Sequence, residues 1–146
     1  MNRKVIDKYF NIAKNASRIS DFPRQHLGAV IMQGGTTISV GYNTTKENPI
    51  QKHYNKYRSD EVFQRNSLHA EMMAIVKLKG IDECVDWRKR TLFVYRESKD
   101  GISALARPCP ACRKALLDYG ITSIYYTTKP KEGTFSYHFE KLTENA

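Results

Sequence analysis

Three side chains of the kinds that bind metal ions are spaced so that they can meet at one site. His69 stands at the start of an apolar helical pattern, and Cys109 and Cys112 are separated by two residues, so one helical turn brings both thiols to the same side. One imidazole and two thiolates suit Zn²⁺, and a site with three protein ligands keeps its fourth tetrahedral position for water. These residues therefore predict a catalytic rather than a structural zinc site.

Glu71 is the residue that would turn such a metal site into an enzyme site. It lies two positions after His69, so its carboxylate cannot easily bind the same ion, but it can reach a water on that ion. Zinc lowers the pKa of a bound water from about 15.7 towards about 7, and a neighbouring carboxylate can take the released proton and deliver it again. We therefore interpret His69 as a metal ligand and Glu71 as a proton shuttle.

Each part of this pattern also has a plainer interpretation. A histidine near a helix start is often a hydrogen-bonded structural residue, and a helical glutamate usually faces solvent. A lone C-x-x-C can be half of a structural zinc site or a redox dithiol at a helix N-terminus. The sequence contains no second C-x-x-C for a four-cysteine site, and its third cysteine, Cys84, is expected to be a small packing residue. The H-A-E pattern combined with a distant P-C-P-A-C is far less expected by chance than either part alone.

The first third of the chain predicts a helix followed by two strands. An amphipathic pattern from the N-terminus predicts a helix that ends before Asp21. Residues 26–33 and 36–43 are β-prone runs, and Gly34 and Gly35 between them supply the positive φ angles that a hairpin turn requires.

The middle of the chain combines a long polar segment with the helix that carries the H-A-E pattern. Residues 44–65 are polar, basic and aromatic, and they predict a long loop with a short helical piece near Glu61. Asn66 or Ser67 is expected to cap the next helix, which continues to Lys79 and ends at the following glycine.

The last third alternates between strand and helix patterns. It predicts, in order, a buried strand at 91–96, a polar loop at 97–107, a helix from Pro110 to Gly120 and a strand at 121–128. The tail segment TFSYHFEKL fits a short helix and a strand equally well. Strands that alternate with helices of this length predict an α/β layered domain with crossover connections and a mixed sheet.

The composition is that of an ordinary globular chain with an excess of positive charge. A length of 146 residues suits one continuous core, so residues 1–146 are expected to form a single domain. No apolar run approaches the roughly 20 residues that cross a bilayer, and the N-terminus lacks a signal-peptide core, so we expect no membrane association and a cytoplasmic location. The net charge of +9 favours a phosphate-bearing substrate or a nucleic acid, although a solvated lysine-rich surface would carry the same charge.

At the H-A-E and P-C-P-A-C positions, the sequence resembles the zinc-dependent cytidine and deoxycytidylate deaminase superfamily, and within it the deoxycytidylate deaminase-like proteins. The segments LGAVIM, SVGYN and ITSIYY are similar as well, so the resemblance covers about residues 1–128. It implies a three-layer α/β/α fold with a central mixed β-sheet. It also implies that His69, Cys109 and Cys112 hold Zn²⁺ while Glu71 is the catalytic residue.

The same resemblance implies a reaction and a set of substrate contacts. Zinc-bound hydroxide would attack C4 of a cytosine ring, while Glu71 carries protons to the ring nitrogen and to the leaving ammonia. The backbone N–H of Ala70 would contact the base, and Asn43 would hold the sugar or the base. Asparagine is also favoured in turns for local reasons, so a purely structural role for Asn43 stays open. Superfamily members commonly assemble, which implies a homo-oligomer.

The substrate is the point at which several alternatives stay open. Lys52 and Arg58 lie among tyrosines in the 44–65 segment and suit a phosphate clamp, which favours a small cytosine nucleotide and conversion of the dCMP to dUMP type. The same residues could track single-stranded DNA or RNA, in which cytosine or adenine would be deaminated. A non-catalytic zinc-containing module that binds nucleic acid is the third alternative, and the presence of Glu71 argues against it.

Two segments depart from the pattern of the family. The sequence after GYN is TTKENP where the family has a glycine-rich segment, which puts regulation by a triphosphate in doubt. The 97–107 segment lengthens the connection from strand to P-C-P-A-C, and it could roof the active site and change what enters.

Overall fold

The computed structural model describes residues 1–57, 67–78, 90–98 and 100–143. None of the helices in these ranges is both long and apolar enough to cross a membrane. In chain order the elements are α1 (Arg3–Ser17), β1 (Gln25–Gln33), β2 (Thr36–Tyr42), β3 (Thr44–Glu47), α2 (Pro49–Asn55), β4 (Ser67–Leu68), α3 (Ala70–Leu78), β5 (Arg90–Ser98), β6 (Ser103–Ala104), α4 (Pro110–Asp118), β7 (Ser123–Lys131) and β8 (Thr134–Lys141).

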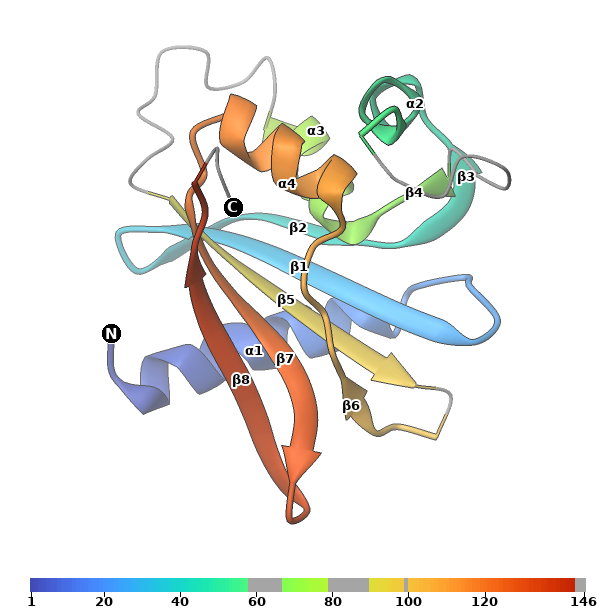
Figure 1. The fold of residues 1–146 in the computed structure, drawn as a ribbon. Helices are drawn as coiled ribbons and strands as arrows, with labels where there is room; N and C mark the ends of the chain where they lie inside the picture. The colour runs from blue at the N-terminus through green and yellow to red at the C-terminus, as the bar shows by residue number, and fades with distance from the viewer. Residues whose placement is uncertain (58–66, 79–89, 99, 144–146) are drawn as a thin grey trace.

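The central sheet has the strand order β2-β1-β5-β7-β8, and the short strand β6 pairs with β5 (Figure 1). Strands β5 and β7 are parallel, and all other pairs in this sheet are antiparallel. A parallel pair needs a crossover connection, and α4 lies in the connection between β5 and β7. The mixed sheet predicted from the sequence is therefore confirmed.

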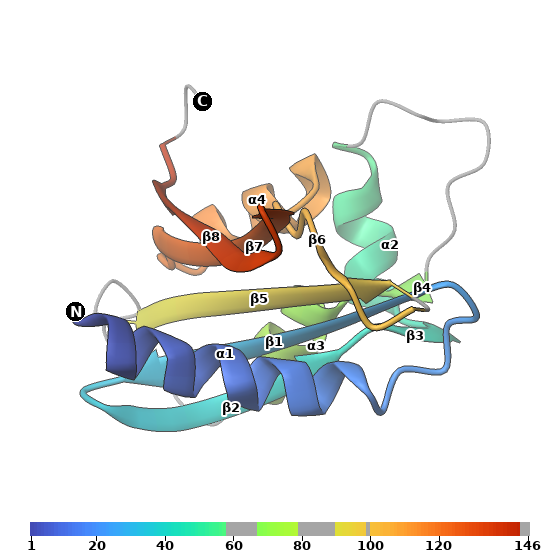
Figure 2. The same cartoon turned by 90° about the horizontal axis from the view of Figure 1, so that it is seen from below.

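Helices cover both faces of this sheet. Helix α1 packs on β1 and β5 from one side, while α3 packs on β2 and β1 from the other side, where α4 and α2 lie next to it. Figures 1 and 2 show α1 separated from the other three helices by the sheet. The arrangement is the three-layer α/β/α architecture that the resemblance implied.

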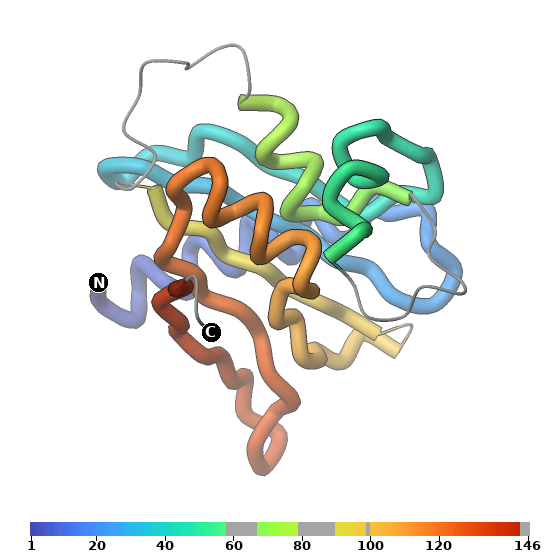
Figure 3. Tube along the Cα trace, turned by 45° about the horizontal axis from the view of Figure 1, so that its top comes forward, coloured from blue at the N-terminus to red at the C-terminus, as the bar shows by residue number. Residues whose placement is uncertain are grey.

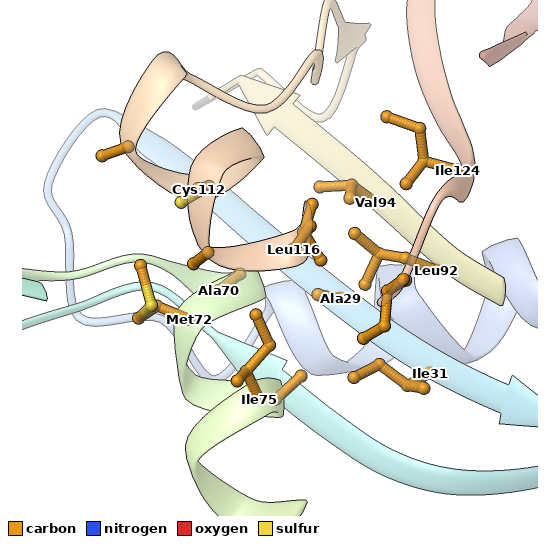
Figure 4. Packing of buried hydrophobic residues seen from close by; sticks show 14 of the residues in the cluster. Ala29, Ile31, Ala70, Met72, Ile75, Leu92, Val94, Cys112, Leu116 and Ile124 are labelled. Atoms are coloured by element: carbon orange, nitrogen blue, oxygen red, sulfur yellow. The ribbon is translucent and has the colours of Figure 1, made fainter. Parts of the chain in front are cut away.

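The strands at the centre of the sheet are apolar on both faces because both faces are covered. On the α3 and α4 side, Ala29 and Ile31 of β1 pack with Leu92 and Val94 of β5 and with the apolar sides of the two helices (Figure 4). On the α1 side, the alternate residues of β1 and β5 pack with residues of α1 in a smaller cluster. Its buried members are Ile6, Tyr9, Phe10, Ala13, Val30, Met32, Phe93 and Tyr95. The helices on each face are thus fixed to the sheet by the apolar layer of that face.

Helix α3 approaches the sheet so closely that only glycine fits beneath it. A Cβ atom added to Gly41 of β2 would lie 2.3 Å from the carbonyl oxygen of Ala70 and 2.7 Å from the backbone nitrogen of Ala74. Both neighbours are helix backbone, which cannot rotate out of the way as a side chain can. Gly41 therefore sets the height at which α3, and with it the H-A-E segment, lies on β2.

A helix occupies part of the segment for which the sequence predicted a long loop, so that prediction was wrong for residues 44–55. The side chain of Asn48 accepts a hydrogen bond from the Ile50 N–H, and Pro49 takes the first helical position, so α2 begins with a standard cap. The helical piece expected near Glu61 lies outside the described residues.

Helix α3 begins later than its predicted caps. Ser67 pairs with Glu47 and Leu68 pairs with Thr44, so these residues form the short strand β4 rather than a helix cap. The first helical residue is Ala70. The predicted end near Lys79 lies outside the described residues, as does Cys84. The helix predicted from Pro110 is confirmed as α4.

The predicted polar loop at 97–107 is in part a strand that turns back along the sheet. β5 continues to Ser98, and Ala104 of β6 pairs with Arg96. Figure 3 shows this segment returning beside β5 before it enters α4. The undecided tail is strand β8, whose aromatic residues at alternate positions pack towards α1, as in the contact of Phe135 with Phe10 at 5.4 Å between ring centroids.

The close approach at Gly41 gives a stability prediction. Gly41→Ala should lower the free energy of unfolding by about 1–3 kcal/mol, because the new methyl group forces the α3 backbone away from β2. Urea unfolding followed by circular dichroism measures this. Gly34→Asn is the matched control, since Gly34 has open space around its Cα and a φ of 58° that asparagine tolerates, and it should change stability by about 0.5 kcal/mol or less. Equal stability of the two variants would contradict the prediction.

Candidate metal centre and active site

The three predicted metal ligands converge where the N-terminal ends of two helices meet. His69 directly precedes α3, Cys109 is the N-cap of α4 and Cys112 lies in the first turn of α4. The Nδ1 atom of His69 lies 3.3 Å from Cys112 Sγ and 3.5 Å from Cys109 Sγ, and all three ligand atoms lie within 4.8 Å of one another. Tetrahedral Zn²⁺ with bonds of about 2.0–2.1 Å to nitrogen and about 2.3 Å to sulfur places these atoms about 3.5 Å apart. The donor set and its spacing therefore fit zinc.

The pKa values of the two thiols are shifted in opposite directions. Hydrogen bonding with the Cys112 thiol lowers the pKa of Cys109 to about 4. The same hydrogen bond, together with burial, raises the pKa of Cys112 well above its usual value. The two sulfurs therefore share one proton, and because zinc binds thiolates, a bound ion would displace that proton.

Glu71 lies in the first turn of α3, two positions after the ligand His69. Its side chain is buried, and its Oε1 atom has no hydrogen-bond partner among the described residues. Burial raises the pKa of Glu71 above its usual value, and the neighbouring His69 acts in the opposite direction. A buried carboxylate oxygen without a protein partner is available to a water or a substrate in the adjacent cavity.

Two of the metal ligands, His69 and Cys109, lie with Glu71 on the wall of a cavity of about 460 Å³. Volumes of this size are typical of sites for small ligands. The cavity lies where β1, the end of β2, the start of α3, β5 and the segment before α4 meet. Its lining residues are Phe22, Gln25, Leu27, Asn43, Ser67, His69, Ala70, Glu71, Arg96, Arg107 and Cys109.

The structure places two predicted substrate contacts, Asn43 and Ala70, on this wall. Asn43 Oδ1 accepts a hydrogen bond from the Leu27 N–H at 2.9 Å, and Nδ2 donates to the Gln25 carbonyl at 3.0 Å. The amide thus holds the end of β2 to β1 and keeps one N–H for a further partner. Ala70 is the first residue of α3, where N–H groups lack intrahelical acceptors. Contact of either group with a substrate stays a prediction.

Of the other two predicted substrate contacts, the structure describes Lys52 alone. Lys52 lies exposed on α2 and is not part of the cavity wall. Arg58 lies outside the described residues. A phosphate clamp from the 44–65 segment therefore stays a prediction without geometric support.

Sequence reasoning missed Gln51, a fully buried residue of α2 that holds the metal-binding segment in place. Gln51 Oε1 accepts a hydrogen bond from the His69 N–H at 3.0 Å, and Gln51 Nε2 donates to Asn55 Oδ1 at 2.8 Å. The signal was present in the pattern, because Gln51, Tyr54 and Asn55 share one face of a helix and are all buried. Recognising it required placing a helix where the composition indicated a loop.

Sequence reasoning also missed two arginines on the cavity wall, Arg96 and Arg107. Arg96 belongs to β5, and its Nη1 donates to the Leu105 carbonyl at 3.1 Å. Arg107 lies two residues before Cys109 and forms two hydrogen bonds with the carboxylate of Glu140. Both place positive charge on the wall of the cavity that holds His69, Glu71 and Cys109.

The sequence matches the family described as the cytidine and deoxycytidylate deaminase zinc-binding region over residues 3–128. This match spans most of the chain and includes all three ligands and Glu71. The chain belongs to this zinc-dependent deaminase family, and the cluster of His69, Cys109 and Cys112 corresponds to its zinc site.

Solved structures with a similar fold include a dCMP deaminase and a cytidine deaminase. The dCMP deaminase of cyanophage S-TIM5 in complex with dCMP and dUMP is 21% identical with a TM-score of 0.60, covering 86% of this chain and 82% of that one. Cytidine deaminase from Burkholderia pseudomallei is 17% identical with a TM-score of 0.57, covering 94% and 92%. At these identities the likeness establishes the cytidine deaminase-like fold. No curated protein matches the sequence.

The ligand geometry predicts which residues zinc needs. The purified protein should contain about one zinc ion per chain, and His69→Ala or Cys112→Ser should lose most of it. Glu71→Gln should keep it, because Glu71 is placed beside the ion and not on it. Elemental analysis of dialysed protein measures zinc, and Cys84→Ser, at the cysteine outside the motif, is the control. Full zinc content in Cys112→Ser would contradict the assignment.

The hydrogen bond from His69 to Gln51 gives a second prediction for this site. Gln51→Ala should weaken zinc binding by about tenfold or more, because groups that orient metal ligands typically contribute 10- to 100-fold in affinity. Competition with a chromogenic chelator measures this. Lys52→Ala is the matched control on the exposed side of α2 and should keep the affinity of the unmodified protein. Equal zinc affinities of Gln51→Ala and Lys52→Ala would refute this role of Gln51.

Proposed function

We propose that this deaminase hydrolyses a small cytosine nucleotide, in a reaction of the dCMP to dUMP type. The observation that carries the proposal is Glu71, which lies on the wall of a cavity shared with His69 and Cys109. Its buried carboxylate has an oxygen without a hydrogen-bond partner among the described residues. A structural zinc site needs no such carboxylate. An acid–base group beside an open metal position is what hydrolytic deamination requires.

The residues divide the reaction between them. Zinc held by His69, Cys109 and Cys112 would supply a water of lowered pKa as the nucleophile. Glu71 takes a proton from that water and delivers it to the ring nitrogen beside C4, and then a proton to the amino group. The water oxygen forms a bond to C4, the bond from C4 to the amino nitrogen breaks, and ammonia leaves. Cytosine and water thus become uracil and ammonia, with Glu71 returned to its starting state.

The remaining wall of the cavity suits the rest of a nucleotide. The Ala70 N–H at the start of α3 and the spare N–H of Asn43 are donors for a base or a sugar. Arg96 and Arg107 supply positive charge for a phosphate. The cyanophage enzyme of similar fold was solved with dCMP and dUMP, which supports a nucleotide of this kind as the first substrate to test.

A panel of substrates tests the proposed reaction. The zinc-loaded protein should release ammonia from dCMP with a higher kcat/KM than from deoxycytidine, cytosine, adenosine monophosphate or a single-stranded oligonucleotide. Ammonia release and the absorbance change from cytosine to uracil are the two measurements. Conversion of the oligonucleotide alone would overturn the proposed substrate, and ammonia release from none of these compounds would favour a binding module.

The role of Glu71 has its own test. Glu71→Gln should lower kcat for dCMP by about 10²- to 10⁴-fold, the usual contribution of a general acid–base group, because glutamine cannot carry the proton. Zinc content, measured in the same preparation, separates loss of the shuttle from loss of the metal. A Glu71→Gln variant with bound zinc and unreduced kcat would show that another group moves the proton.

A further inference from the structure

Arg107, on the wall of the substrate cavity, is held by a residue from the far end of the chain. Its Nε and Nη2 atoms donate to the two carboxylate oxygens of Glu140 at 2.9 and 3.1 Å. The hydroxyl of Tyr126 donates to Glu140 Oε1 at 3.1 Å, which fixes the carboxylate from a second direction. The side chain of Glu140 is 17% exposed and that of Arg107 is 44% exposed, so the acid is the more enclosed partner.

Glu140 reaches this position because β8 extends the sheet beside β7. Glu140 is paired with Ile124 in the register of the two strands, close to the end of β8. The match to the deaminase family ends at residue 128, and β8 begins at Thr134. The carboxylate that holds Arg107 therefore comes from a strand beyond the matched part of the chain.

The second arginine of the cavity is held differently. Arg96 donates to the Leu105 carbonyl through Nη1, and it forms no ion pair within the described residues. Leu105 follows β6, and Arg107 lies two residues further on, so the short segment after β6 positions both guanidinium groups. Counting Arg96, Arg107 and Glu140 as ionised, this part of the wall carries a net charge of about +1.

The bidentate pair leaves much of Arg107 available. A guanidinium group has five N–H donors, and Glu140 engages the Nε donor and one donor of Nη2. The remaining N–H groups can donate to an anion as a second partner while the ion pair persists. An arginine held in one orientation also loses less side-chain freedom when it binds a ligand than a free arginine does.

We propose that Arg107 and Arg96 form the subsite for the phosphate of the substrate, and that Glu140 is the positioning residue that directs Arg107 to it. The C-terminal strand thereby determines the preference for a nucleotide over a nucleoside. This inference rests on the proposed function for the identity of the substrate, and it extends that function to a strand beyond the matched part of the chain.

A merely structural role for the ion pair makes different predictions. A partly exposed ion pair contributes little to stability, so removing it should leave the fold in place. If the pair served only to anchor the segment before Cys109, its loss would weaken zinc binding and would reduce activity on nucleotide and nucleoside alike. A positioning role for a phosphate affects the two substrates unequally.

The experiment compares Arg107→Gln, Glu140→Gln and the double variant in the zinc-loaded protein. The preference for dCMP over deoxycytidine, taken as the ratio of the two kcat/KM values, should fall about 10- to 100-fold in Arg107→Gln, as expected for a lost charged hydrogen bond. It should fall about 3- to 10-fold in Glu140→Gln, through KM for dCMP rather than kcat. The double variant should match Arg107→Gln, because Glu140 acts through Arg107. Lys131→Gln, a charge-matched change on the β7 and β8 hairpin away from the cavity, is the control.

Binding of dUMP and deoxyuridine, measured by calorimetry, provides a readout that needs no turnover. The unmodified protein should bind dUMP more tightly than deoxyuridine. Both variants should reduce that difference in affinity, and Arg107→Gln should reduce it more than Glu140→Gln. Unchanged preference in both variants, or an equal loss for nucleotide and nucleoside, overturns the inference. If dUMP binds with the predicted preference but no cytosine compound is deaminated, the proposed reaction fails while the phosphate subsite stands.

Discussion

The meeting of two helix N-termini is the contact on which the site depends. Neither α3 nor α4 contains a complete metal site, and the three ligand atoms come together only because both helices lie on the same face of the sheet. The parallel pairing of β5 and β7 places α4 on that face, and the absence of a side chain at Gly41 lets α3 lie directly on β2. The positive ends of both helices then face one point, where they favour thiolates and an anionic carboxylate.

Burying the polar side chains of Glu71 and Gln51 costs free energy. Hydrogen bonds offset this cost more fully for Gln51 than for Glu71. Gln51 is satisfied by the His69 N–H and by Asn55, so it links α2 to the metal-binding segment at little cost. One oxygen of Glu71 has no such partner in the described part of the chain, and a buried unpaired oxygen is destabilising by roughly 1–3 kcal/mol. The fold is thus less stable at Glu71, the residue that we propose contacts the reacting water and the substrate.

The sequence was sufficient to predict the cluster of zinc ligands and insufficient to predict the rest of the cavity wall. The ligands and Glu71 were predictable because the H-A-E and P-C-P-A-C motifs resemble those of a known deaminase family, and because one helical turn brings the two cysteines together. Helix α2 was missed because its burial depends on distant partners, such as the hydrogen bond from Tyr54 to Asp118. The cavity arginines were missed for the same reason, since Arg96 faces the cavity through its register with Leu27 and Ala104, and no local pattern specifies that register.

The segment after β6 and strand β8 are the elements through which we propose that a common deaminase site acquires its own selectivity. Thr127 Oγ1 donates to the Ala104 carbonyl and Ala106 N–H donates to the Thr127 carbonyl, so this segment is fastened to β7 on the way to Cys109. Substitutions here can change the charge that a substrate meets without moving the zinc ligands, because the ligands are set by α3 and α4. Under the proposed function, the metal chemistry and the recognition of the rest of the substrate reside on different elements, joined by the two residues between Arg107 and the first turn of α4.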